Sequence, residues 1–275
     1  MSVIGIRQKM ETPNFRDGKK SLKWVPKKGQ SLDRCATLSD KYICCNVHVI
    51  KSLSNCPFEC SYCFLQNYLT DGTLSAVKDL KAVLDEIREK LHDQPWRFFR
   101  IGNWELGDSL AIEKQTGQAA HLIRAFSTFQ NAVLELKTKS ADVDSILNIP
   151  HQGRTVVSWS LNPQDVIGKD EHKTASLENR LKAIQRVANA GYRVGLHFDP
   201  MIEYKGWREG YANLVQQVFA HAPLHSIAWI SIGSLRFNPE MKRKLEQNFP
   251  RSKLTLSEMV LGDDRKLRYV KPLPN

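Results

Sequence analysis

The sequence predicts an α/β fold, a partial TIM-like barrel made of six consecutive βα units. Two observations lead to this prediction. Six short runs rich in β-branched and aromatic residues alternate with amphipathic helical patterns, and polar residues collect where the runs end. Strict βα alternation favours a parallel sheet with right-handed crossovers. Eight units close a full barrel, so six predict an open one whose active loops follow the carboxyl ends of the strands.

The individual elements are read from hydrophobic periodicity and from the turn residues that bound each run. The expected strands span Tyr42–Ile50, Arg97–Ile101, Ala132–Leu136, Thr155–Leu161, Tyr192–Phe198 and Ile227–Ile232. Helices are expected over residues 77–91, 119–129, 177–188 and 211–219, with a shorter helix around Val143–Leu147 and a last helix from Pro239 to Phe249.

The composition is that of an ordinary globular enzyme. Of the 275 residues, 41% are apolar and 25% are charged. No apolar stretch approaches the roughly 18 residues of a membrane span, and the N-terminus has no secretory signal, so we expect no membrane association. Six cysteines are too few for a disulfide scaffold. The expected compartment is therefore the cytoplasm, where clustered cysteines usually serve metal binding or catalysis.

Charge and composition divide the chain into three expected parts. Residues 1–40 form a basic N-terminal extension, in which 19–28 are loop or partly disordered; residues 41–250 form the barrel; residues 251–275 form a C-terminal segment. Residues 1–30 hold eight basic and two acidic side chains, residues 236–275 hold ten and five, and the rest is neutral. Two basic ends on a neutral body predict a polyanionic partner or, more simply, solubilising tails.

The run Cys56-Pro-Phe-Glu-Cys60-Ser-Tyr-Cys63 follows the first expected strand. Three thiolates can hold three irons of a [4Fe–4S] cluster and leave the fourth iron open. The alternative is a zinc site completed by Cys44, Cys45 or His48, although zinc sites usually combine two separated cysteine pairs. Cys35, Cys44 and Cys45 have no spacing partner and are interpreted as small buried hydrophobes.

This spacing after the first strand of a (βα)6 pattern resembles the signature of the radical SAM superfamily. The resemblance implies that S-adenosylmethionine (SAM) binds the open iron and is reductively cleaved to a 5′-deoxyadenosyl radical. A one-electron donor such as flavodoxin or ferredoxin is then expected. Tyr62 is expected beside the adenine and is the candidate catalytic side chain, unless it only packs within the loop.

The carboxyl ends of the later strands supply further candidates for SAM contacts. Gly102 and Glu105 resemble the second-strand element that holds the SAM amino group, and Asp108 is close enough to share that role. The simpler interpretation of Glu105 is a surface acid beside a tight turn. Lys139 is expected to meet the SAM carboxylate, with Lys137 as an alternative on the opposite face of the strand.

Three residues after the fourth and fifth strands complete this set. Ser160 and Asn162 are candidates for the SAM ribose. His197, followed by Asp199, is a cofactor candidate, although a lone histidine in such a place is more often structural.

Longer stretches resemble spore photoproduct lyases and the related group of DNA repair photolyases. The matching pieces are Cys56–Gln66, Glu105 with residues 108–110, Thr138-Lys139, residues 160–162, residues 199–202, Gly206-Trp207 with Tyr211, residues 258–262 and residues 267–269. The resemblance implies radical reversal of a covalent thymine dimer in flipped-out DNA, completed by a cysteine that returns a hydrogen atom.

The chain departs from that family pattern in three places. The hydrogen-donor cysteine should lie near Glu105 or Leu106, where this chain has none, and a tyrosine beside the cluster is replaced by Phe64. Relatives continue past the position of Pro272, so the C-terminus is expected to be shorter or truncated. Lesion reversal in DNA is the leading hypothesis. The alternatives are a radical SAM enzyme acting on RNA, a peptide or a small molecule, and a nucleic-acid-binding protein with a structural metal site.

Overall fold

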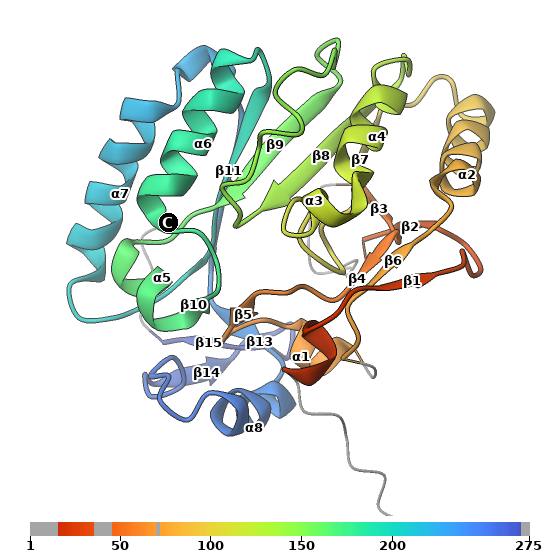
Figure 1. Cartoon of the computed structure of the whole chain (residues 1–275). Helices are drawn as coiled ribbons and strands as arrows, with labels where there is room; N and C mark the ends of the chain where they lie inside the picture. The colour runs from red at the N-terminus through yellow and green to blue at the C-terminus, as the bar shows by residue number, and fades with distance from the viewer. Residues whose placement is uncertain (1–15, 36–45, 70–71, 271–275) are drawn as a thin grey trace, which may run out of the picture.

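The computed structural model describes residues 16–35, 46–69 and 72–270, and within them a curved sheet of seven strands forms the centre of the fold (Figure 1). The strand order is β12-β11-β9-β8-β7-β3-β2. The six predicted strands are all present and mutually parallel: β3 (Val47–Ile50), β7 (Phe99–Gly102), β8 (Ala132–Thr138), β9 (Thr155–Ser160), β11 (Arg193–Met201) and β12 (Ile227–Ser234). The predicted partial barrel is therefore confirmed. Residues 42–45 of the first expected strand lie outside the described residues.

The seventh strand comes from the segment expected to precede the barrel. β2 (Leu32–Arg34) pairs antiparallel with β3. The same segment of the chain also contains a 3₁₀ turn over Asp17–Lys19 and a strand β1 (Lys23–Val25). β1 pairs with β6 (Ser75–Val77), which also pairs with β4 (Leu53–Ser54). The expectation of loop over residues 19–28 was wrong at β1, because β6 satisfies its backbone hydrogen bonds.

Four helices cover one side of the sheet, as Figure 1 shows. They are α2 (Leu80–Asp93), α4 (Gln118–Phe126), α6 (Leu177–Asn189) and α7 (Trp207–His221). Their predicted apolar stripes pack into one core with the outward side chains of the strands. Asp79 and Ser176 cap α2 and α6 by accepting backbone hydrogen bonds. No helix among the described residues combines the length and apolar character needed to span a bilayer.

The helix expected around Val143–Leu147 does not form, and the third crossover consists of turns. Val143 and Ile146 are fully buried, which explains the apolar pattern that predicted a helix. The hydroxyl of Tyr192 donates to the carbonyl of Ile146 (2.7 Å), and Ile149 N–H donates to the same carbonyl (3.2 Å). These turn contacts take the acceptor that a helix would have used, and Pro150 follows directly.

The shorter elements gather at the carboxyl ends of the strands. They are α1 (Leu65–Tyr68), α3 (Glu113–Thr116), α5 (Gln164–Asp170), β5 (Glu59–Cys60) and β10 (Glu171–His172), whereas the 3₁₀ turn Leu224–Ser226 lies at the amino end of β12. The predicted last helix, α8 (Pro239–Asn248), is present, and β13 (Arg236–Phe237), β14 (Met259–Leu261) and β15 (Leu267–Tyr269) form a small sheet beside it (Figure 1). A second apolar cluster joins this C-terminal part to Cys60 and Tyr62. The three-part division of the chain stays a prediction.

The middle of β11 tolerates only glycine. A Cβ atom on Gly195 would overlap the Ser158 hydroxyl and lie 2.7 Å from Trp229 Nε1. We expect Gly195→Ala to lower the free energy of unfolding by about 2 kcal/mol, because neighbouring strands cannot move apart without breaking the sheet.

The matched control is Gly168→Ala in α5, where a Cβ meets nothing within 4 Å. It should be neutral or stabilising by up to about 1 kcal/mol. Urea unfolding of both variants checks the prediction, and equal stability of the two would contradict the packing argument.

Candidate active site

The loop with the three cysteines is held in a defined shape by its neighbours. Asn55 adopts a left-handed conformation (φ +69°) and accepts the backbone N–H of Cys56 at 2.8 Å. Gly107 approaches so closely that a Cβ there would lie 2.9 Å from the Asn55 carbonyl oxygen. Cys56 and Cys60 are buried and Cys63 is half-buried. The loop after β3 therefore presents its sulfur atoms from a rigid backbone.

A short ladder fixes the second half of this loop. β5 pairs antiparallel with β10, so that Cys60 lies opposite Glu171. Ser61 donates from its backbone N–H to the carbonyl of Asp170 (2.8 Å) and from its hydroxyl to the Asp170 carboxylate (2.6 Å). Ser252, from the C-terminal part, donates to the same carboxylate at 2.7 Å. Asp170 thus ties the cysteine loop to the end of α5 and to the C-terminal part.

The donor set suits an iron–sulfur cluster. Burial raises the pKa of the Cys56 thiol and raises that of Cys60 to about 12, so both are neutral thiols until a metal displaces their protons. Among the described residues, no three histidine, cysteine or acidic side chains converge as a single ion requires. Thiolates that each bind a different iron of a cluster need no such convergence.

The zinc alternative gains no ligand from the structure. His48 lies on β3, is 3% exposed, and packs edge-on against Phe99 with ring centres 5.1 Å apart. Cys44 and Cys45 lie outside the described residues. Cys35 is buried, as expected from the sequence, and its Sγ lies 3.8 Å from Glu105 Oε1.

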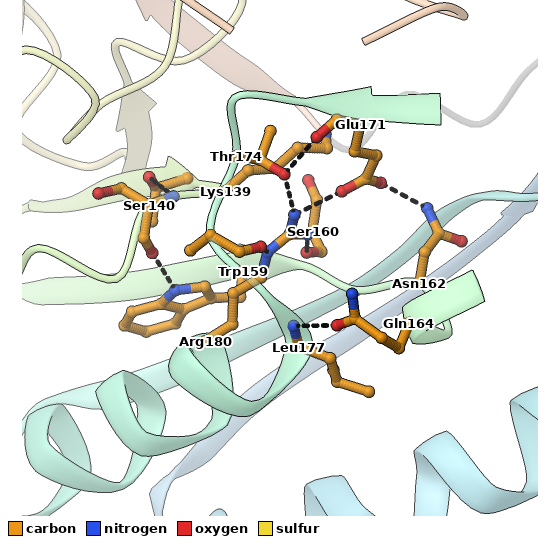
Figure 2. A network of polar contacts seen from close by, with 12 residues as sticks. Lys139, Ser140, Trp159, Ser160, Asn162, Gln164, Glu171, Thr174, Leu177 and Arg180 are labelled. Atoms are coloured by element: carbon orange, nitrogen blue, oxygen red, sulfur yellow. Dashed lines mark hydrogen bonds and ion pairs between the residues drawn. The ribbon is translucent and has the colours of Figure 1, made fainter. Parts of the chain in front are cut away.

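A buried ion pair joins the cysteine loop to the rim of the barrel (Figure 2). Arg180 of α6 donates to Glu171 at 2.6 Å, and both side chains are 0% exposed. Arg180 also donates to the carbonyl of Ser160 (2.9 Å) and to the hydroxyl of Thr174 (2.6 Å). The other Glu171 oxygen accepts from Asn162 (2.8 Å) and from the Tyr62 hydroxyl. Burial alone would raise the pKa of Glu171, but the Arg180 charge lowers it.

Two predicted contacts, Tyr62 and Lys139, meet above this pair. The Lys139 ammonium lies 5.6 Å from the centre of the Tyr62 ring. Burial alone would lower the pKa of Lys139, but Cys60 and Glu171 raise it, so the lysine stays charged. Asn162 and Ser160 end in the same region, and the Tyr211 hydroxyl donates to Asn162 Oδ1 at 2.5 Å. The structure therefore brings Tyr62, Lys139, Ser160 and Asn162 together beside Cys60.

The loop after β7 contributes the second predicted group. Both oxygens of Asp108 are occupied: they accept from the backbone N–H groups of Leu110, Ala111 and Lys139 and from the Thr138 hydroxyl, at 2.6–3.0 Å. Asp108 thus positions the backbone that carries Lys139. A Cβ on Gly102 would overlap Trp104, so this glycine is needed for the tryptophan to cross the strand. Glu105 is half-buried beside Cys35.

His197 belongs to a different group, inside the barrel. Its Nε2 atom lies 3.0 Å from Glu135 Oε1 and 3.2 Å from Trp229 Nε1. Among the described residues, the contacts of its ring run to these two side chains and not to the cysteine loop. Burial lowers the pKa of His197, which keeps the imidazole neutral. Its predicted contact with the cofactor stays a prediction.

The prediction that Lys137 and Lys139 lie on opposite faces of the strand was wrong. Side chains two residues apart in a strand point to the same side of the sheet. Leu134 and Leu136 are fully buried in the outer core, whereas Lys137 lies 4.3 Å from the ring centre of Trp104, inside the barrel. Sequence patterns also gave no signal for Glu171 and Arg180. The pairing of β10 with β5 brings Glu171 to the cysteine loop, and Arg180, nine residues later in α6, reaches back to it.

A six-stranded parallel partial barrel with a CxxxCxxC loop after its first strand is the architecture of the radical SAM class. The family model for spore photoproduct lyase matches residues 35–271, and the chain belongs to this family. The spore photoproduct lyase of Bacillus subtilis (strain 168) is 30% identical over 228 residues, which are 81% of this chain and 64% of that protein. The spore photoproduct lyase of Clostridium acetobutylicum is 24% identical, over 97% of this chain and 76% of that protein.

Solved structures share the fold. A mutant spore photoproduct lyase with bound AdoMet and dinucleoside spore photoproduct superposes with a TM-score of 0.82 at 24% identity. The match covers 98% of this chain and 80% of that chain. This chain therefore spans less than two thirds of the Bacillus subtilis protein. Almost all of its own length has the same fold as the solved structure.

We expect Arg180→Met to lower the free energy of unfolding by about 4 kcal/mol, because it leaves the Glu171 carboxylate buried without a counter-charge. Urea unfolding measures the loss. Adding Glu171→Gln should recover part of it, since the buried charge is then removed. Lys182→Met, which breaks an exposed pair with Glu178, is the control and should cost far less. Similar losses in Arg180→Met and Lys182→Met would contradict the assigned weight of the buried pair.

Glu135 makes stability depend on pH. Burial alone would raise the pKa of this carboxyl from 4.5, but its hydrogen bond to His197 and the Arg100 charge lower it to about 2. A lowered carboxyl pKa adds stability above about pH 4.5 that is lost as the pH falls towards 2, here about 3 kcal/mol in full. Glu135→Gln should therefore be less stable than the wild type near neutral pH, and the difference should shrink between about pH 4.5 and about pH 3. Urea midpoints across this range check it; a difference that stays constant with pH would contradict it.

Proposed function

We propose that this chain is a radical SAM enzyme that acts on a DNA lesion, in the manner of spore photoproduct lyase. The observation that carries the proposal is the cysteine loop, three buried or half-buried thiols held between β4 and α1 beside Tyr62 and Lys139. The family match and the shared fold support the same activity. The chain spans 64% of the Bacillus subtilis relative.

The chain's own residues have distinct tasks in this proposal. Cys56, Cys60 and Cys63 would hold a [4Fe–4S] cluster, and Lys139, Ser160, Asn162 and Glu105 would hold SAM, with Gly102 and His197 as further candidates. When bound, these cofactors supply a 5′-deoxyadenosyl radical. Tyr62 stays neutral because burial raises the pKa of its hydroxyl, which donates to Glu171. The Glu171–Arg180 pair holds the side chains of Tyr62 and Asn162 in place, because both hydrogen-bond to Glu171.

The proposed DNA contact lies on the C-terminal part. Arg243 and Lys244 are exposed on α8, and Arg251, Lys253 and Arg265 are exposed beyond it. Lys244 reaches the carbonyl of Gln66 in α1 (3.5 Å), which places this cation next to the cysteine loop. Phosphate contacts there would bring a duplex to the mouth of the barrel.

The hydrogen donor must differ from that of the lyases, because no cysteine lies near Glu105 or Leu106, where the family places one. A thiol nevertheless reaches this loop from another element: Cys35, at the end of β2, contacts Glu105. This contact favours lesion reversal over the alternative substrates, RNA, a peptide or a small molecule. A flavodoxin or ferredoxin as electron donor and a cytoplasmic location stay part of the proposal.

The test is anaerobic reconstitution with iron and sulfide, reduction, and measurement of 5′-deoxyadenosine with and without UV-irradiated DNA. We expect the wild type to bind about four irons, to cleave SAM and to release thymine from dinucleoside spore photoproduct. Cys60→Ala should lose iron and SAM cleavage while keeping its fold, and Cys35→Ala is a matched thiol control for iron content.

Each alternative predicts a different outcome. SAM cleavage without any thymine released would favour another substrate. Salt-dependent DNA binding without 5′-deoxyadenosine would favour a nucleic-acid-binding protein with a structural metal. Unchanged iron content in Cys60→Ala would contradict the assigned ligands.

A further inference from the structure

Three charged residues at alternate positions along β8 and the residue after it point into the barrel. Glu135, Lys137 and Lys139 alternate with the buried Leu134, Leu136 and Thr138. Residues two apart on a strand are spaced by about 7 Å, so the three form successive levels below the cysteine loop. Lys139 is the upper level, next to Tyr62. Lys137 lies one level deeper, on the side away from the cluster loop.

The lowest level is closed and fully satisfied. Glu135 is 0% exposed and uses both oxygens: one accepts from Arg100 (2.8 Å) and Trp104 Nε1 (3.1 Å), the other from Ser158 (2.9 Å) and lies 3.0 Å from His197. Arg100 also stacks 3.9 Å from the ring centre of Trp229. Because every polar atom of the carboxylate has a partner, this level is a floor that supports side chains above it and needs no ligand.

The middle level is not satisfied. The Lys137 ammonium contacts the ring of Trp104 at 4.3 Å, and no acceptor for its hydrogen bonds lies within reach among the residues that the structure describes. An ammonium carries three N–H donors, and because Lys137 is only half-buried these donors are open to a ligand that enters the barrel. A ligand with an acceptor atom would complete this level.

An acceptor enters the barrel at the same level from β11, which is separated from β8 only by β9. His197, two residues before Asp199, reaches Glu135, which is two residues before Lys137, so Asp199 and Lys137 enter one level above that contact. Burial lowers the pKa of Lys137, and the charges of Glu135 and Asp199 act against this shift. The Asp199 Oδ1 atom lies over Gly233, where a Cβ would approach to 2.8 Å, and 3.7 Å from Arg236. Its second oxygen has no partner in the described part of the chain. The middle level thus offers a donor and an acceptor together.

The charges at this level select the kind of ligand. A phosphate would meet the Asp199 carboxylate with Glu135 beneath it, and an amine would meet the Lys137 ammonium with Arg100 nearby. A neutral, planar group that carries a carbonyl beside an N–H satisfies both residues without adding charge. The amide or imide edge of a pyrimidine base has this pattern.

We propose that Lys137 and Asp199 are specificity-determining residues that bind the imide edge of a flipped-out thymine, Lys137 donating to a carbonyl and Asp199 accepting the ring N–H. The inference rests on the proposed function. It adds the residues that recognise the base, one level below the SAM contact Lys139.

The test is equilibrium binding of dinucleoside spore photoproduct to reconstituted protein with SAM, by calorimetry under anaerobic conditions. Lys137→Met and Asp199→Ala should each weaken binding by about tenfold to a hundredfold, since each loses a hydrogen bond to a charged group. Lys182→Met, an exposed lysine on α6, is the control and should bind like the wild type. All variants are compared at equal iron content and equal thermal midpoint, so that a folding defect is recognised.

An N3-methylated lesion provides the second arm. The methyl group removes the N–H that Asp199 accepts, so it should weaken binding to the wild type and to Lys137→Met but not further weaken binding to Asp199→Ala, which has no side-chain acceptor. If the variants bind both ligands like the wild type, the assignment of Lys137 and Asp199 is overturned while the proposed function stands. If the wild type cleaves SAM but neither binds nor repairs the lesion, both the proposed substrate and this inference are contradicted.

Discussion

The ion pair between Glu171 and Arg180 is the contact on which the arrangement of the candidate site depends. It is fully buried and joins three parts that are far apart in sequence: the cysteine loop through Tyr62, the end of β9 through Ser160 and Asn162, and the start of α6. A buried pair of this kind gives little net stability compared with apolar packing, but removing one partner is costly. Its value here is positional, because each hydrogen bond fixes the direction of a group at the candidate cofactor site.

The rest of the site follows from how that pair is supported. The β5–β10 ladder sets Cys60 opposite Glu171, and the Asp170 carboxylate ties the same loop to Ser61 and Ser252. On the other side, Asp108 holds the backbone of Lys139. The cysteine loop and the lysine are therefore positioned by two separate buried carboxylates, each satisfied by backbone or hydroxyl donors. This separation lets the metal ligands and the cation keep their places independently.

Much of the fold could be predicted because the local periodicity of apolar residues indicates its strands and helices. Six strands and the main helices repeat patterns of two and 3.6 residues, and each was found close to its expected range. The exceptions had non-local causes. Val143 and Ile146 look helical but are buried under turns that Tyr192 stabilises, and β1 forms because β6 is available to pair with it.

The candidate site was predictable only where a motif carried it. The cysteines and Lys139 stand in recognisable patterns, whereas Glu171 and Arg180 are an ordinary acid and an ordinary base until the chain folds. His197 illustrates the opposite case: its position after the fifth strand suggested a cofactor contact, but its hydrogen bonds run to Glu135 and Trp229. The position of a residue along a strand sets how deep its side chain lies in the barrel. The side chains that it contacts at that depth determine its role.

That distinction gives β8 its particular role. Three alternate residues on one strand meet three different environments: Glu135 is saturated by donors, Lys137 has only an aromatic ring, and Lys139 lies among Tyr62, Cys60 and Glu171. The charge sign alone would assign both lysines to an anionic ligand. The surroundings separate them, because Lys139 stands beside Tyr62 and Cys60, whereas Lys137 lies deeper, beside the ring of Trp104. Under the proposed function, this part of the chain would contact SAM at the rim and an uncharged base one level below, above the Glu135 carboxylate, whose oxygens already have partners.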